Sequence, residues 1–180
     1  MKIETILKQD GIGVLPTDTL YGVVGSALSK KAVQRIYDLK GRDENKPFII
    51  LISHIGDLAL FGVKLSKEQA LLLKKLWSEK RPTSVIVPVT QKKFEYLHRG
   101  THSLAFRLPK NKSLSTLLKK TGPLVAPSAN PQGMTPAKNV TEAKKYFSTN
   151  VDFYQSGTKK EGKPSKIVSL LGLQPEVLRK

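Results

Sequence analysis

Three cations and a turn of polar residues carry the clearest chemical signal in this sequence. Lys40, Arg42 and Lys46 lie within a span of seven residues, just before a proline and an apolar run. Upstream, Pro16 closes another apolar run and leaves residues 17–19 in a turn that can face a ligand, because proline ends strand pairing. Three cations on a short loop between strands suit a polyphosphate, although in so basic a chain a K-x-R triplet on its own more often marks a solvated surface.

Two further segments place polar groups beside apolar strands. Ser128 and Asn130 follow the short apolar run 124–126, and open α/β sheets bind their ligands where a strand leads into a loop. Arg107 lies inside the apolar run 104–108. An arginine in such a run is either an outward charge on an edge strand or an inward anchor for an anion.

The charge balance favours a polyanionic partner or substrate. Lys and Arg number 31 against 14 acidic residues, which gives a formal net charge of +17 and a pI near 10.1. Nucleic acid is the first candidate for such a chain. The lysine doublets are spread along the sequence and form no single block, so a dedicated binding groove and a generally basic surface with weak RNA attraction both stay open.

Several other classes of site are excluded. The chain has no cysteine, which rules out disulfides, thiolate nucleophiles and thiolate metal sites. Gly11-x-Gly13 precedes an apolar strand instead of following one, and no G-x-x-x-x-G-K-[ST] loop exists, so an ATP site here is of neither the Rossmann nor the P-loop type. His54, His98 and His102 lie outside the polar motifs, and we expect them to be structural or on the surface.

Nothing near the start of the chain predicts export or membrane insertion. The first ten residues, M-K-I-E-T-I-L-K-Q-D, place charges among their apolar residues and contain no long hydrophobic run. Neither a signal peptide nor a membrane span is therefore expected, and we expect a cytoplasmic protein.

Two helices in the predicted set carry recognisable end signals. Ser29 is a candidate N-cap for a helix that delivers Lys40 and ends at Gly41. Ser66 and Gln69 have the spacing of a capping box at the start of another helix, in which Leu71, Leu72 and Trp77 are expected in the core.

Apolar periodicity predicts the remaining elements. Residues 23–28 fit either a strand or the run into the helix after Ser29, and residues 90–101 fit a loop or a ragged hairpin. We expect further helices at residues 3–7, 55–61, 66–77, 113–120 (capped by Ser113) and 141–147, and strands at 12–15, 48–52, 84–89, 104–108, 124–126, 151–154, 167–171 and 176–179. Helices that alternate with short strands, without a repeat or linker, predict one α/β domain over residues 1–180.

The polar motifs together resemble those of a known enzyme family. P-T-D-T-L-Y-G at residues 16–22, K-G-R at 40–42 and S-A-N at 128–130 resemble the YrdC-like (TsaC) threonylcarbamoyl-AMP synthases, in their short single-domain form. The resemblance implies a twisted open mixed sheet with flanking helices and a concave ligand cavity. It also implies a nucleotidyltransferase that forms threonylcarbamoyl-AMP and pyrophosphate from L-threonine, bicarbonate or CO2, and ATP, for threonylcarbamoyladenosine modification of tRNA.

The same resemblance implies the cofactors, partners and site residues. ATP would be a substrate with magnesium bound to it and no metal held by protein side chains, and a downstream tRNA threonylcarbamoyl transferase would use the product. Contact with tRNA or double-stranded RNA would run through the basic surface. The matched positions imply catalytic roles for Lys40 and Arg42, ATP contacts for Arg42, Lys46, Ser103, Ser128, Asn130 and Arg179, and threonine contacts for Thr19, Arg107 and Ser165.

The chain departs from the family pattern in two places. Residues 79–84, E-K-R-P-T-S, stand where the family usually has W-P-G-P-[LV]-T, and Lys166 replaces the threonine of an S-T-[VI] segment. Two alternatives to the enzyme stay open: a non-catalytic RNA-binding relative that kept the fold and the charge, and a paralogue that uses another small amino acid or carboxylate, since one methyl group in a pocket discriminates weakly.

Overall fold

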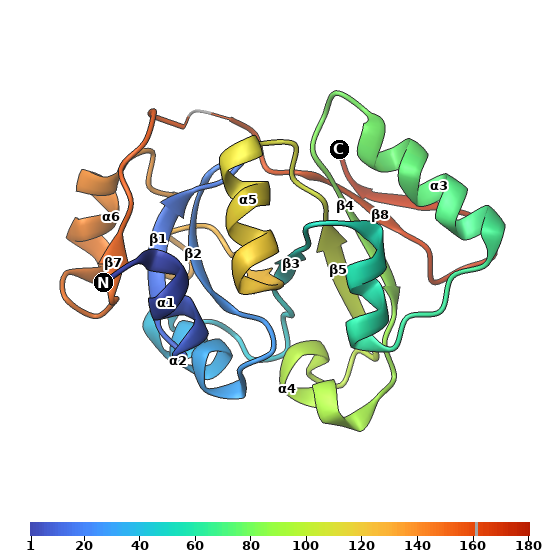
Figure 1. The fold of residues 1–180 in the computed structure, drawn as a ribbon, viewed down its shortest axis with the longest axis horizontal. Coiled ribbons are helices and arrows are strands. Elements are labelled where there is room, and N and C mark those ends of the chain that lie inside the picture. The colour runs from blue at the N-terminus through green and yellow to red at the C-terminus, as the bar shows by residue number, and fades with distance from the viewer. Residues whose placement is uncertain (161) are drawn as a thin grey trace.

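A computed structural model describes residues 1–160 and 162–180 of the protein. Its centre is a nine-stranded sheet in the order β7-β1-β2-β6-β3-β5-β4-β8-β9 (Figure 1). Parallel pairs (β1–β7, β3–β5, β4–β8) and antiparallel pairs (β1–β2, β2–β6, β3–β6, β4–β5, β8–β9) are mixed, which confirms the predicted mixed α/β sheet. The strands are β1 Ile12–Pro16, β2 Tyr21–Ser26, β3 Ile49–Leu51, β4 Thr83–Pro88, β5 Ser103–Arg107, β6 Leu124–Val125, β7 Phe153–Tyr154, β8 Lys166–Ser169 and β9 Glu176–Arg179.

The helices begin and end largely where local chemistry predicts. The side chain of Ser29 accepts a hydrogen bond from the Ala32 amide at 3.0 Å, and Gly41 closes the same helix with φ +55°, a conformation that glycine adopts at little cost. Ser66 and Gln69 form the predicted capping box. The helices are α1 Ile3–Lys8, α2 Lys30–Lys40, α3 Lys67–Ser78, α4 Glu95–His98, α5 Lys112–Thr121 and α6 Val140–Phe147, with 3-10 helices η1 Ile55–Phe61 and η2 Lys92–Phe94.

The sheet separates two apolar clusters. Alternate residues of a strand point to opposite faces, so Ile50 joins the larger cluster with Tyr37 and Phe61, whereas Leu51 joins the smaller one with Leu114. The smaller cluster lies under α1 and α5, which Figure 1 shows side by side over the β1–β2 end of the sheet. In the described part of the chain, no helix is both long and apolar enough to cross a membrane.

Three local predictions are wrong. Residues 90–101, predicted as a loop or ragged hairpin, contain η2 and α4. The helical turns bury Phe94 and Leu97 in the larger cluster. Helix α5 is capped by Asn111, whose side chain accepts from the Leu114 amide at 3.1 Å, not by Ser113. Leu71, expected in the core, is 66% exposed, whereas Leu72 is partly buried and packs against the core as expected.

Candidate functional site

A cavity of about 430 Å³ lies on one side of the sheet. Its floor consists of strand residues that point away from the larger cluster. Ile49, Ala105 and Ile167 line the cavity. The next residue of each strand (Ile50, Phe106 and Val168) belongs to the larger cluster. The cavity is therefore built on the sheet face opposite that cluster. Seven of the ten predicted site residues line it: Thr19, Arg42, Ser103, Arg107, Ser128, Ser165 and Arg179.

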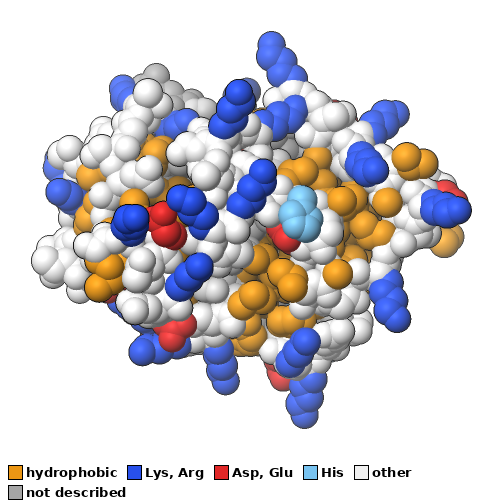
Figure 2. Space-filling view, in the orientation of Figure 1, with side chains coloured by type: hydrophobic (Ala, Val, Ile, Leu, Met, Phe, Trp, Pro, Cys, Tyr) orange, Lys and Arg blue, Asp and Glu red, His pale blue; other side chains and the backbone are white. Residues whose placement is uncertain are grey.

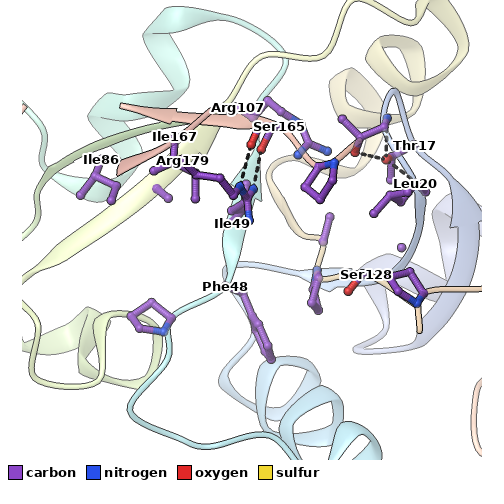
Figure 3. Close-up of a pocket in the computed structure, with 18 of the residues that line it drawn as sticks. Thr17, Leu20, Phe48, Ile49, Ile86, Arg107, Ser128, Ser165, Ile167 and Arg179 are labelled. Carbon is purple, nitrogen blue, oxygen red and sulfur yellow. Dashed lines mark hydrogen bonds between the residues drawn. The ribbon is translucent and has the colours of Figure 1, made fainter. Parts of the chain in front are cut away.

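The cavity has two walls, which come from different parts of the sheet (Figure 3). One wall, here called the loop wall, is made by Arg42, Phe48 and Ser128, which lie on loops or just before β3. The other, here called the strand wall, is made by Arg107, Ser165 and Arg179, on or beside β5, β8 and β9.

On the loop wall, a backbone carbonyl and an aromatic ring hold the Arg42 side chain in place. Its Nε donates to the Lys46 carbonyl at 3.1 Å, and its guanidinium carbon lies 5.2 Å from the centre of the Phe48 ring. Phe48 in turn stacks on Tyr37 at 4.1 Å, and the Tyr37 hydroxyl donates to the same Lys46 carbonyl at 3.1 Å. Burial lowers the pKa of Arg42. Its two terminal nitrogens make no hydrogen bond or ion pair with any described residue, so they are free to bind an anion.

Pairing between the chain segments brings Ser128 to this wall. The Val23 amide donates to the Pro127 carbonyl at 2.9 Å, and the Ala129 amide donates to the Tyr21 carbonyl at 2.8 Å. Gly22 forms an isolated bridge with Ser128, and a Cβ added there would lie 3.2 Å from the Pro127 carbonyl oxygen. A side chain at this position would therefore push its neighbours apart slightly, and glycine permits the close approach without that shift.

Three predicted site residues do not line the cavity. Lys40 is buried, and its ammonium donates to the carbonyl oxygens of Ser128, at 2.6 Å, and of Asn130. The amide of the Asn130 side chain donates to the Pro131 and Met134 carbonyls. The Lys46 ammonium is exposed and lies 3.3 Å from Asp43. Lys40 and Asn130 therefore shape the loop that carries Ser128, and the substrate roles predicted for these three residues stay predictions.

On the strand wall, Arg107 points inward and forms a buried ion pair. Its Nη2 lies 2.9 Å from Oδ1 of Asp18, although that oxygen accepts no well-aligned hydrogen bond from a described residue. Burial lowers the pKa of Arg107, and the charge of Asp18 opposes that shift. The inward orientation, one of the two alternatives for Arg107, is confirmed, whereas its role as an anchor for an anionic ligand stays a prediction.

A hydroxyl network fixes Arg179 beside Arg107. The Ser165 hydroxyl lies 2.9 Å from that of Ser84. Arg179 donates from Nε to the Ser165 carbonyl at 2.9 Å and from Nη2 to its hydroxyl at 3.2 Å (Figure 3). Burial lowers the pKa of Arg179, and repulsion from Arg107 and Arg81 adds to the effect. This wall thus gathers positive charge that an anion would neutralise.

The turn after β1 adds hydroxyls. The Thr17 hydroxyl donates to the Leu20 carbonyl at 2.7 Å and lies 3.2 Å from the Thr19 hydroxyl. Both threonines line the cavity, so the polar turn predicted from the sequence faces a common hollow with Arg42 and Arg107.

Three contributors were missed at the sequence level. Asp18 lies inside the P-T-D-T motif, but only the fold brings it to Arg107. Ser84 is buried behind Ser165, and its available signal was the hydroxyl that it keeps at the end of the altered E-K-R-P-T-S segment. Phe48 was predicted only as an apolar strand residue. Its position directly after the loop of cations was the available clue to its contact with Arg42.

The two departures from the family pattern meet in space. The Lys166 ammonium lies 3.3 Å from the Glu79 carboxylate, so the residue that replaces the threonine pairs with the first residue of the altered loop. Ser84, at the end of that loop, keeps a hydroxyl against Ser165. The altered segments therefore still support the strand wall.

No protein-held metal centre is seen in the described residues, where no group of three or more His, Cys, Asp or Glu side chains could hold an ion. The described side chains that line the cavity include arginines and hydroxyls but no carboxylate. His54 pairs with Asp57, His98 is buried, and neither they nor His102 lines the cavity. Three arginines and several hydroxyls around one hollow can hold two anionic groups close together.

The comparisons with known proteins point to one family. Residues 5–180 match the Sua5/YciO/YrdC family model, described as telomere recombination. The chain is 26% identical over 175 residues to a threonylcarbamoyl-AMP synthase of Pyrococcus abyssi, covering 96% of this chain and 51% of that protein. It is 30% identical over 170 residues to the threonylcarbamoyl-AMP synthase of Hahella chejuensis, covering 92% of this chain and 90% of that protein.

A solved structure extends the likeness to three dimensions. The crystal structure of Pyrococcus abyssi Sua5 complexed with L-threonine matches with a TM-score of 0.88 at 25% identity, covering 98% of this chain and 52% of that chain. The protein therefore spans about half the length of the Pyrococcus abyssi relative and nine-tenths of the Hahella chejuensis one.

Proposed function

Because the chain belongs to the Sua5/YciO/YrdC family, we propose that it is an L-threonylcarbamoyladenylate synthase. The proposed reaction converts L-threonine, bicarbonate or CO2, and ATP into threonylcarbamoyl-AMP and pyrophosphate. Relatives that bear the name threonylcarbamoyl-AMP synthase support this activity, and a related structure holds L-threonine. The observation that carries the proposal is the single cavity that Arg42, Arg107, Arg179 and Ser128 share.

The chemistry requires two anions to meet. The amine of threonine adds to bicarbonate with loss of water and gives a carbamate, whose oxygen attacks the α-phosphorus of ATP while pyrophosphate leaves. Carbamate and triphosphate repel each other unless cations lie beside both. In the proposed arrangement Arg42 presents its free terminal nitrogens to the phosphates, and Arg179 supplies charge from the opposite wall.

Threonine is assigned to the strand wall and the β1–β2 turn. Arg107 lines the cavity, so its guanidinium is proposed to bind the amino-acid carboxylate while its ion pair with Asp18 persists. Thr19 and Ser165 add hydroxyls on the same cavity. Ser103, which also lines it, and the more distant Lys46 and Asn130 keep their proposed contacts to ATP.

Magnesium is proposed to enter with ATP. The described cavity lining offers no carboxylate, so the phosphate oxygens and water would provide the ligands, as magnesium commonly prefers. When bound there, the ion would neutralise phosphate charge, and the protein's own residues would hold the nucleotide and the amino acid in place.

Contact with tRNA is a proposal for the surface rather than for the cavity. Figure 2 shows Lys and Arg side chains spread over the visible face without a single dense patch, so on this face the charge fits a generally basic surface. Binding through phosphates alone should weaken steeply with salt. A cytoplasmic location and transfer of the product by a downstream tRNA threonylcarbamoyl transferase complete the proposed role.

The test is a pyrophosphate-release assay with substrates omitted one at a time. We expect release only when ATP, L-threonine and bicarbonate are all present, and a product adenylate that carries isotope from labelled threonine in mass spectrometry. Release that does not depend on threonine would contradict the proposal. Arg42→Met should lower kcat/KM by about 10- to 100-fold, as loss of a charged hydrogen bond predicts, whereas Arg35→Met, on the exposed pair with Asp152, should leave kcat/KM unchanged.

A further inference from the structure

Lys40 differs from the other cations of its loop in where its ammonium lies. It is the last residue of α2, and no other lysine of the described residues is buried. Its ammonium faces the backbone of the S-A-N segment and not the cavity, which Arg42, two residues later, does line. The left-handed turn at Gly41 separates the two side chains.

Contacts in both directions join the two segments. Besides the bonds from the Lys40 ammonium to the Ser128 and Asn130 carbonyls, the Gln132 amide donates to the Lys40 carbonyl at 2.8 Å. The Gln132 side chain accepts from the Asp43 amide, also at 2.8 Å. Four hydrogen bonds therefore tie residues 128–132 to residues 40–43, and the two that reach the S-A-N segment itself both come from the Lys40 ammonium.

The charge state of Lys40 suits this role better than phosphate binding. It has no ion-pair partner among the described residues, and burial, followed by repulsion from Arg42, lowers its pKa to about 7. Arg42 is the charged group that acts on it, since the facing segment offers carbonyl oxygens. A neutral amine still has two N–H donors for the two carbonyls, whereas a lysine that binds phosphate does so as a point charge.

We infer that Lys40 is a positioning residue, which sets the S-A-N segment and so places Ser128 at the loop wall without touching substrate. This role departs from the catalytic role that the sequence implied for Lys40. Its consequence for ATP use rests on the proposed function, but the tie between the segments does not.

Hydrogen exchange measured by mass spectrometry on the full chain tests the tie directly. In Lys40→Met we expect amides of residues 128–132 to exchange at least about tenfold faster, because two hydrogen bonds to a buried ammonium are lost. Lys31→Met makes the same change at an exposed lysine of the same helix and should leave the segment unchanged. Unaltered exchange of residues 128–132 in Lys40→Met would overturn the inference.

A second measurement on the unsubstituted protein covers the case in which Lys40→Met does not fold. With lysine labelled at the ε-carbon, one NMR resonance should titrate near pH 7. Adding pyrophosphate should raise that midpoint by less than about one unit, through neutralisation of Arg42 alone, because the ammonium does not reach the cavity. A rise of the midpoint by one unit or more would mean direct contact with the anion and would overturn the positioning role. Both readouts are independent of turnover, so an inactive enzyme would count against the proposed function alone.

Discussion

The two walls of the cavity hold their arginines in different ways. On the loop wall, the Arg42 side chain donates to a backbone carbonyl, as do Lys40 and Tyr37 behind it. On the strand wall, Arg107 depends on the carboxylate of Asp18, and Arg179 depends partly on the Ser165 hydroxyl. A backbone acceptor survives most substitutions, whereas a side-chain acceptor is lost with one. The strand wall should therefore be the more sensitive to single substitutions.

The largest effect is expected for Arg107→Met. It leaves the Asp18 carboxylate buried without its counter-charge, and breaking a buried pair in this way costs about 3–5 kcal/mol of unfolding free energy. Urea denaturation followed by circular dichroism measures the loss. The double variant Asp18→Asn with Arg107→Met should recover most of it.

A matched control uses the exposed pair between Arg35 and Asp152, which is also 2.9 Å long. Arg35→Met should cost about 0–1 kcal/mol, as exposed pairs do. Equal losses for the two arginine variants would mean that burial of the Arg107 pair does not set its importance.

Ser165→Ala should have an intermediate effect. It removes one of the two acceptors of Arg179 and leaves the buried Ser84 hydroxyl without that partner, at a cost of about 1–3 kcal/mol. Calorimetry should show a lower melting temperature, and the KM for ATP should rise. Ser78→Ala, at an exposed serine, should stay within about 0.5 kcal/mol. If Ser165→Ala melts at the same temperature as the parent protein, the proposed role of the network of Ser84, Ser165 and Arg179 is contradicted.

The smallest effect is expected on the loop wall, for Phe48→Leu. The change removes the ring between Tyr37 and Arg42 but leaves the bond from Arg42 to the Lys46 carbonyl, at a cost of about 0.5–1.5 kcal/mol for the aromatic pair. We expect the KM for ATP to rise severalfold with kcat little changed. Phe153→Leu, away from the cavity on β7, should leave that KM unaltered. If Phe48→Leu lowers the free energy of unfolding by more than Arg107→Met does, the proposed order of sensitivity of the two walls is reversed.

Local signals allowed much of the fold to be predicted. Helix α2 depends on Ser29 and Gly41, whose roles as caps follow from side-chain and backbone chemistry alone. Leu71 shows the limit of periodicity: its spacing fits a core position, but α3 packs at one end of the sheet and leaves this side out in solvent. Which face of a helix is buried depends on neighbours that a local pattern does not contain.

The candidate site, too, could be predicted only in part. Residue types identified Arg42, Arg107 and Ser128 as anion-binding candidates, and the cavity brings them together. The separate positions of Lys40 and Arg42 could not be read from K-G-R, because one left-handed residue turns neighbouring cations to different environments. The role of Asp18 was missed because its partner, Arg107, lies far along the chain and only the fold brings the two together.

The strand order has a consequence for how the protein is made. Thr17 precedes β2, and Arg179 belongs to β9, yet both line the same hollow. During synthesis, a ribosome-bound chain that lacks β8 and β9 has the P-T-D-T turn and the cation loop but only Arg107 of the strand wall to face them. Such long-range pairings form late and slowly, so ligand-binding competence should emerge in one step, as the last strands join the sheet.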